Sequence, residues 1–239
     1  MLREFEQESA APITIRKELK TNLSDRQSPF LLVELIVVAM VLFLLSVTGG
    51  GIAFVVPIAY ILLDTARRGR TWQELGLRQR TFTKDLYNNA GLVILSFAGI
   101  QSLIVWGGWL LLPSYLDYVL IHRAWSVQFD FGSFILILFS IPLTTMLEEV
   151  IFRGLFQERL SWFFGQGVSL FIASLLFAAI HWTPNDSIIV LIDLIAIAAG
   201  GLVYGVIYMR CKNIYISWCA HMLSDLYGLL LLFLIFNLL

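Results

Sequence analysis

Charged residues are scarce in this chain. Of its 239 residues, only 14% are charged and 59% are hydrophobic, whereas a soluble domain carries about 25% charged residues. The mean hydropathy of +0.82 points the same way. These values exclude an ordinary soluble domain and indicate an integral membrane protein. The net charge of −1 gives no indication of nucleic-acid binding, so we expect no nucleic-acid partner.

Cysteine is also rare. The two cysteines, Cys211 and Cys219, are too few for a disulfide framework, and they form neither a CxxC motif nor a metal-like spacing with histidine. We expect both to be buried thiols that serve packing. The sequence also has no repeat of fixed period and no low-complexity tract. It therefore predicts a single membrane domain.

Long apolar runs are abundant. A run of about 17 to 25 apolar residues predicts a helix that crosses the bilayer. Such runs lie near Phe30–Val47, Leu86–Leu112, Phe131–Arg153, Gly167–Trp182, Ile188–Met209 and Ile214–Leu238. A further run, Gly50–Asp64, is only just long enough and is interrupted by Pro57. The sequence therefore predicts an all-α polytopic membrane helix bundle of about seven transmembrane helices.

The distribution of basic residues predicts the orientation. If the amino terminus is cytoplasmic and the helices alternate, 15 of the 16 lysines and arginines fall on the cytoplasmic side, and only Arg123 falls outside. The positive-inside rule then predicts N-in, C-out. Residues 1–29 mix both signs of charge and lack a signal-peptide pattern. We expect a cytoplasmic tail at 1–29 and a membrane-embedded domain at 30–239.

Two segments outside the charged motifs suggest local structure. The polar segment from Arg70 to Tyr87 has apolar residues dotted through it, which predicts a short interfacial helix and a turn at Gly76 at the cytoplasmic face, with a solvated loop as the alternative. The small residues Gly200, Gly201 and Gly205 predict close packing between helices.

Ionisable residues inside the apolar runs form three short motifs on three predicted helices. The motifs are Glu148-Glu149-x-x-x-Arg153, Phe177-x-x-x-His181 and His221-x-x-x-Asp225. A charged residue at membrane depth costs about 2.5 to 3.5 kcal/mol on insertion scales, so such residues are seldom kept without a partner or a task. Together the motifs predict a functional site. Asp193, near the outer end of its helix, is expected to be structural or solvated.

Helical spacing separates the two adjacent glutamates. Glu149 and Arg153 are four residues apart with the acid first, which favours an ion pair along one helix. Glu148 is turned about 100° away and does not easily share that partner. Low-dielectric surroundings disfavour its charged form, which suits a proton acceptor near neutral pH. We therefore expect Glu148 to be the available acid, with His181 sharing its water.

The predicted depths of the motifs overlap. At about 1.5 Å per helical residue, Glu148 lies on the order of 15 Å from the cytoplasmic end of its helix, and His181 lies about 20 Å deep. His221 and Asp225 lie about 10 to 18 Å deep. We expect the three motifs to converge on one cavity near mid-membrane that is reached from the cytoplasm.

The motifs resemble those of a known family. EEVIFRG, FAAIH and HMLSD, in this order on successive predicted helices, resemble motifs of the CPBP family, also called Abi, which includes type II CAAX prenyl endopeptidases and bacteriocin-processing or immunity proteins. TWQELGL is similar to another segment of that family. The resemblance runs from about Arg70 to the carboxyl end, with a motif core at about 131–239. It implies an intramembrane endopeptidase that cleaves peptide bonds near the cytoplasmic face.

The resemblance also implies roles for the first two motifs. Glu148 would be the base that activates water, and His181 would assist it. Glu149 and Arg153 would organise the site.

The third motif departs from the family in one position. His221 and Asp225 would polarise the scissile carbonyl and stabilise its oxyanion, which requires donors aimed at developing charge. The last position is often asparagine in the family, and its amide donates, whereas an ionised Asp225 only accepts. Either Asp225 is protonated, or it orients and charges His221, which then donates alone. We favour the second alternative.

Zinc is the alternative to a metal-free site. Carboxylates and histidines are zinc ligands, and the family is read both as metalloprotease and as glutamate-dependent without a metal. The sequence lacks the HExxH spacing of many zinc proteases, and Arg153 beside Glu149 disfavours a cation there. We expect no cofactor. If a metal is bound, Glu148, His181 and His221 are the expected ligands.

Two other classes of function fit parts of the sequence. A non-catalytic membrane adaptor or bacteriocin-immunity protein of the same fold would tolerate loss of the base, yet Glu148, His181 and His221 are all present. A transporter would more naturally show paired halves with broken helices, which we do not find.

The expected partners are membrane lipids and a peptide or membrane-protein substrate. Prenylated CAAX tails are the best-known substrates of the family, but in a bacterial host a leader peptide or a membrane-protein terminus is the better expectation. We expect a bacterial inner membrane or another membrane that faces the cytoplasm.

Overall fold

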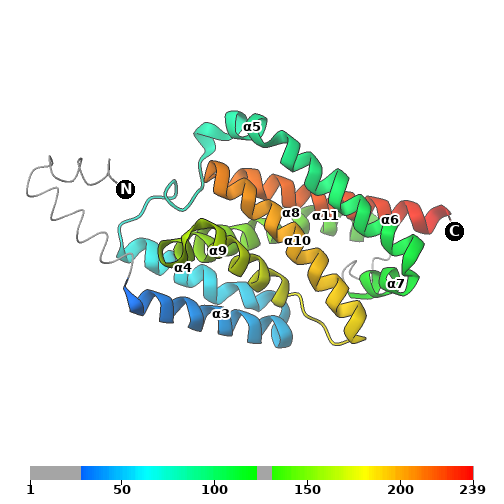
Figure 1. Cartoon of the computed structure of the whole chain (residues 1–239), viewed down its shortest axis with the longest axis horizontal. Coiled ribbons are helices and arrows are strands. Elements are labelled where there is room, and N and C mark those ends of the chain that lie inside the picture. Colours follow the sequence, from blue (N-terminus) through cyan, green and yellow to red (C-terminus); the bar gives the residue numbers. More distant parts are fainter. Residues whose placement is uncertain (1–27, 123–130, 239) are drawn as a thin grey trace, which may run out of the picture.

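The structure, a computed structural model, describes residues 28–122 and 131–238. Within these ranges it consists of helices joined by turns and short loops, without strands (Figure 1). The predicted all-α class is therefore confirmed. Residues 1–27 of the expected tail, and Arg123, lie outside the described ranges.

The helices follow one another with short connections. In chain order they are α3 (Pro29–Gly49), η1 (Gly50–Phe54), α4 (Val55–Arg67), η2 (Gln79–Thr81), α5 (Phe82–Ile94), η3 (Leu95–Ile100), α6 (Gln101–Leu111), α7 (Pro113–His122), α8 (Phe131–Glu149), η4 (Val150–Gln157), α9 (Glu158–Ala179), α10 (Ser187–Cys211) and α11 (Ile214–Leu238). Two of the short segments, η3 and η4, are π-helical. In Figure 1, α5 and α6 run along one side of the molecule and α3 along the opposite side.

Among the described residues, five helical stretches are long and apolar enough to cross a membrane. They are Phe30–Thr48, Gln79–Leu111, Ile135–Ala179, Ser187–Cys211 and Ile214–Ile235. The third stretch is broken at Gly165, whose φ of 76° and ψ of 169° suit glycine. The predicted multi-pass bundle is confirmed, and the number seven and the N-in, C-out orientation stay predictions.

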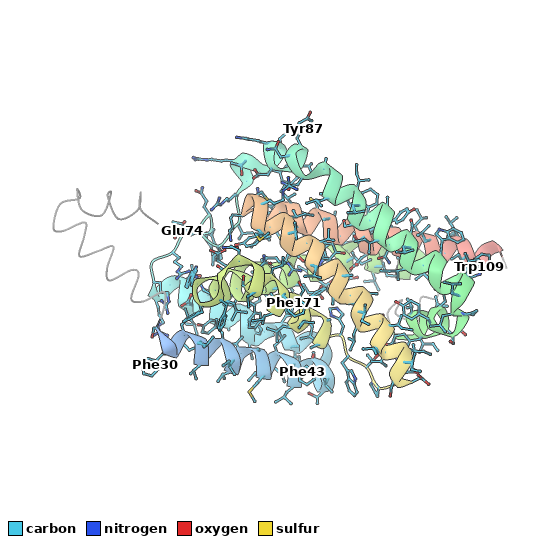
Figure 2. The ribbon with its side chains drawn as sticks, viewed as in Figure 1. Phe30, Phe43, Glu74, Tyr87, Trp109 and Phe171 are labelled. Carbon is cyan, nitrogen blue, oxygen red and sulfur yellow. The ribbon has the colours of Figure 1, made fainter. Side chains whose placement is uncertain are left out.

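Large apolar side chains cover the outer surface of these helices. Phe30 and Phe43 project from the outer side of α3 (Figure 2) and are 77% and 39% exposed, and Phe171 on α9 is 56% exposed. The opposite face of α3 is buried in the bundle through residues such as Leu31 and Leu35. Exposed apolar area on this scale marks an interaction surface, and in a membrane bundle it faces the lipid tails.

The polar segment between α4 and α5 is folded onto the bundle. The predicted turn at Gly76 is present, with a φ of 96°, and its carbonyl oxygen accepts a 2.8 Å hydrogen bond from the Ile214 backbone. A Cβ atom at Gly154, within the EEVIFRG motif, would lie only 3.2 Å from the Leu75 carbonyl oxygen. The segment is a series of turns followed by η2 where a short helix was expected, and it packs directly against the motif-bearing helix.

Glycines allow α10 to approach its neighbours closely, as the sequence predicts. A Cβ atom at Gly201 would lie 3.1 Å from Phe177 Cδ1, and one at Gly205 would lie 2.3 Å from Leu170 Cδ1. Gln157 Nε2 donates a 2.9 Å hydrogen bond to the Gly205 carbonyl oxygen. These contacts fix α10 against both α9 and η4.

A buried ion pair joins α4 to the start of α9. Arg159 Nη2 lies 2.7 Å from Asp64 Oδ2, and the two side chains are 2% and 3% exposed. Arg68 donates to the other oxygen of Asp64, and Arg159 stacks over Trp162. This cluster holds the helix that follows η4 and thereby supports the end of the motif-bearing segment.

Candidate active site

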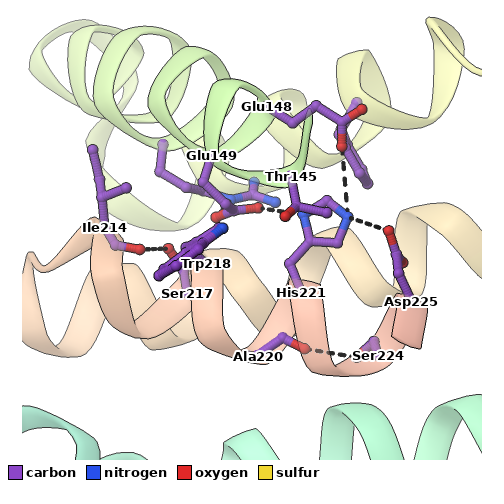
Figure 3. A network of polar contacts seen from close by, with 12 residues as sticks. Thr145, Glu148, Glu149, Ile214, Ser217, Trp218, Ala220, His221, Ser224 and Asp225 are labelled. Carbon is purple, nitrogen blue, oxygen red and sulfur yellow. Dashed lines mark hydrogen bonds and ion pairs between the residues drawn. The ribbon is translucent and has the colours of Figure 1, made fainter. Parts of the chain in front are cut away.

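Three helical elements bring the predicted motifs together. Glu148 is on α8, His181 follows α9, and His221 and Asp225 are on α11. All four side chains line one cavity of about 570 Å³. Figure 3 shows Glu148 and Glu149 facing His221 and Asp225 across the interface between α8 and α11. The convergence expected from helical depth is thus present in the tertiary structure.

Proline shapes the helix that carries the glutamates. Pro142 lies inside α8, where it has no N–H to donate to the preceding turn. Trp218 Nε1 on α11 donates a 2.9 Å hydrogen bond to the Pro142 carbonyl oxygen, and Thr145 Oγ1 donates at 2.7 Å to the Ile141 carbonyl oxygen. The π-helical segment η4 begins directly after Glu149. α11 therefore holds α8 one to two turns before the glutamates.

Glu149 bridges two basic groups. Its Oε2 accepts a 3.1 Å hydrogen bond from Arg153 Nε, and both side chains are 0% exposed. Its Oε1 lies 3.1 Å from His221 Nδ1. Because a carboxylate accepts, Nδ1 carries the proton in this hydrogen bond. The expected ion pair is present, and the second contact, with a residue 72 positions away, was not foreseen.

Glu148 faces both motif histidines. Its Oε1 lies 3.9 Å from His181 Nε2, and its Oε2 lies 3.6 Å from His221 Nε2. These distances exceed direct hydrogen bonds, so the carboxylate and the two Nε2 atoms do not bond to each other directly. His181 Nδ1 lies 2.8 Å from the Phe177 carbonyl oxygen, which makes Nδ1 the donor and directs Nε2 to Glu148. The geometry suits a water held between the carboxylate and the rings.

Asp225 occupies a more open position. Its side chain is 45% exposed, and its Oδ2 lies 3.8 Å from His221 Nε2. The expected role of Asp225 in orienting His221 stays a prediction, and the hydrogen bond that His221 Nδ1 donates goes to Glu149. The nitrogen that faces Asp225 is the same one that faces Glu148.

Aromatic rings enclose the histidines. Phe177 makes edge contacts with His181 and His221, with ring centroids 4.8 Å and 5.4 Å apart. Tyr204 on α10 stacks on His221 at 4.6 Å with an interplanar angle of 19°. Tyr204 was not among the predicted site residues, because its stretch AGGLVYG indicates only helix packing. The aromatic frame restricts the His221 ring to one orientation.

Asp193 lines the same cavity as the motif residues. Its side chain is buried, and its two oxygens accept hydrogen bonds of 3.4 Å from the hydroxyls of Tyr115 and Tyr118. It is therefore not solvated, and the structural role is the one that these contacts support.

Histidines and carboxylates also raise the question of zinc. Within the described ranges, no three His, Cys, Asp or Glu side chains are gathered so as to hold a metal ion. The donors of Glu148, His181 and His221 thus do not form a ready ligand set. The absence of a cofactor stays a prediction.

Comparison with protein families gives one match. Residues 130–227 match the family model described as type II CAAX prenyl endopeptidase Rce1-like, and this stretch contains all three motifs. Comparisons with curated proteins and with solved structures gave no match.

Proposed function

Residues 130–227 form a domain of the type II CAAX prenyl endopeptidase Rce1-like family, and from this premise we propose that the chain is an intramembrane endopeptidase that hydrolyses peptide bonds near the cytoplasmic face. At the level of the family, the chain is a CAAX-protease-type membrane hydrolase. The proposal that the chain hydrolyses peptide bonds rests on the Glu148 carboxylate. It faces the Nε2 atoms of two histidines at 3.9 Å and 3.6 Å in one cavity.

Glu148 is the general base of the proposed reaction. It accepts a proton from a water molecule held against His181 Nε2, and the water oxygen attacks the scissile carbonyl carbon. When the tetrahedral intermediate collapses, the C–N bond breaks and the leaving nitrogen takes the proton from Glu148. General acid–base catalysis of this kind contributes about 10²- to 10⁴-fold.

His221 stabilises the charge that develops on the carbonyl oxygen. Glu149 accepts from Nδ1 at 3.1 Å and, together with the carboxylate of Asp225, favours the protonated ring. Nε2–H then donates to the oxyanion. Loss of one such donor lowers kcat by about 10²- to 10³-fold in other hydrolases. Arg153 holds the Glu149 carboxylate in place through the 3.1 Å contact of its Nε.

Replacing the base tests the proposal. Glu148→Ala in purified protein should lower turnover of a peptide substrate at least 100-fold, which is the low end of the range for a general base, and should leave the melting temperature unchanged. Glu74→Ala is the matched control, because Glu74 is an exposed acid of the interfacial segment, and it should retain full activity. Equal turnover by wild type and Glu148→Ala would refute the role of Glu148.

The inactive variant Glu148→Ala can be used to identify the substrate. We propose a leader peptide or a membrane-protein terminus, with a prenylated tail as the other class, and a bacterial inner membrane or another cytoplasm-facing membrane as the location. Cross-linking of membranes that contain Glu148→Ala, followed by mass spectrometry, should recover a peptide that wild type cleaves. Recovery of the same intact partner with both forms would favour the non-catalytic adaptor or immunity protein.

A further inference from the structure

The cavity extends along α11 beyond the proposed catalytic residues. His221, Asp225 and Gly228 all line it, and their spacing of four and then three residues puts them on one face of the helix. Gly228 therefore lies about 10 Å from His221 along the helix axis. The part of the cavity near Gly228 is two helical turns from the reacting groups.

Gln101, the first residue of α6, fills the space opposite Gly228. A Cβ atom at Gly228 would lie 2.2 Å from Gln101 Nε2, so the position of this amide requires glycine on α11. The next residue anchors the arrangement, because Ser102 Oγ lies 3.1 Å from Tyr227 Oη. Glycine on α11 thus leaves room for the amide, and the serine–tyrosine contact ties the start of α6 to α11.

The Gln101 side chain faces the cavity. It is half-buried and lines the cavity together with Gly228, and within residues 28–122 and 131–238 no hydrogen bond of its amide is found. An amide offers two donors and an acceptor oxygen. An amide held in this way at a cavity wall is arranged to bind a ligand.

The helix before Gln101 has a π-helical turn. η3 ends at Ile100, and Ser96 and Ile100 line the same cavity. π-helical turns are rare and are frequent at functional sites. The other π-helical segment of the described chain, η4, follows Glu149. Of the two π-helical segments, η3 therefore contributes residues to the cavity wall beside Gln101, whereas η4 adjoins the glutamate pair in sequence.

We propose that Gln101 binds the backbone of the substrate peptide about three residues from the scissile bond. This inference rests on the proposed peptidase function. A carboxamide both donates and accepts, which matches the N–H and C=O of a peptide group. An extended peptide rises about 3.3 Å per residue, so the distance of about 10 Å corresponds to about three residues.

Kinetics of two variants test the contact. With a fluorogenic peptide selected from a library by wild-type cleavage, Gln101→Ala should raise KM about 5- to 10-fold and change kcat less than about 2-fold, as expected for loss of uniform binding. Gly228→Ala should give the same increase, because its methyl group displaces the amide. The KM of the double variant should be no higher than that of Gln101→Ala. Gly107→Ala is the control. Gly107 lies on α6, the same helix as Gln101, and a Cβ atom there would meet nothing within 4 Å.

Backbone substitution in the substrate tests the partner directly. Esters that replace single peptide bonds should raise the wild-type KM at one position two to four residues from the scissile bond, and Gln101→Ala should abolish that difference. An unchanged KM in Gln101→Ala, or an ester effect that persists in it, would overturn the inference while the peptidase function stands. Absence of any cleavage by wild type would overturn both.

Discussion

Replacing Glu149 with glutamine removes one buried charge and almost no volume. The Glu149 carboxylate contacts Arg153 Nε and His221 Nδ1, each at 3.1 Å, and the Glu149 and Arg153 side chains are 0% exposed. Arg153 Nη1 and Nη2 have no hydrogen-bond partner in the described part of the chain. In Glu149→Gln the guanidinium therefore stays buried and loses its counter-charge.

The size of the stability loss in Glu149→Gln follows from the burial of the ion pair. Breaking a buried ion pair by removing one partner costs about 3 to 5 kcal/mol. For a chain of this size, 1 kcal/mol lowers the melting temperature by about 2 to 4 °C. Glu149→Gln should therefore melt about 6 to 20 °C below wild type in thermal unfolding followed by circular dichroism in detergent. It should also lose activity, because His221 loses the acceptor that fixes its ring.

A second glutamate supplies the control. Glu158 Oε2 lies 2.8 Å from Lys212 Nζ, closer than the Glu149 pair, but the two side chains are 21% and 27% exposed. Because solvent reaches this pair, its loss should cost less than the loss of the fully buried pair, so Glu158→Gln should melt closer to wild type than Glu149→Gln does.

Removal of both charges separates stability from function. Glu149→Met combined with Arg153→Met should recover much of the lost stability, since apolar residues commonly replace a buried pair without cost, and it should remain inactive. A melting temperature of Glu149→Gln within about 4 °C of wild type, or equal losses in Glu149→Gln and Glu158→Gln, would refute the reasoning.

Three further predictions concern the metal, the interfacial segment and the orientation. Protein dialysed against a chelator should keep its activity and contain less than about 0.1 zinc per chain by mass spectrometry, whereas zinc-dependent recovery of lost activity would contradict a metal-free site. Gly154→Ala should lower the free energy of unfolding by about 1 to 3 kcal/mol, because the added methyl group presses on Leu75 and Ile214. Gly167→Ala is the control and should cause no loss of stability, because a methyl group there meets nothing within 4 Å. In a background without native cysteines, an impermeant maleimide should label Thr71→Cys from the cytoplasmic side only and Asn185→Cys from the outer side only, and the reverse pattern would exclude N-in.

Local features of the site follow from the sequence. The pairing of Glu149 with Arg153 depends only on four-residue spacing along one helix, and it is present at 3.1 Å. The turn at Gly76 and the close packing at Gly201 likewise depend on glycine at particular positions. The sequence suffices in these cases because the ion pair lies on one helix face and because the small size and backbone freedom of glycine are properties of the residue itself.

The contact between His221 and Glu149 lies beyond such reasoning. Asp225, four residues away, was the expected orienting group, but Glu149 of α8 makes the hydrogen bond. Which carboxylate reaches Nδ1 depends on the rotation of the ring and on the axial position of α11 against α8. The stacking of Tyr204 on the His221 ring likewise depends on how α10 packs against α11.

Hydropathy, charge distribution and three motifs by themselves determined the membrane class, the helical fold and the set of ionisable residues, because apolar runs and four-residue spacings act within single helices. Tertiary structure alone decided that Glu149 also contacts His221, that Glu148 faces two histidines, and that Gln101 lies against Gly228. Those contacts join helices far apart in sequence, and their geometry follows from how the helices rotate and slide against one another when they pack.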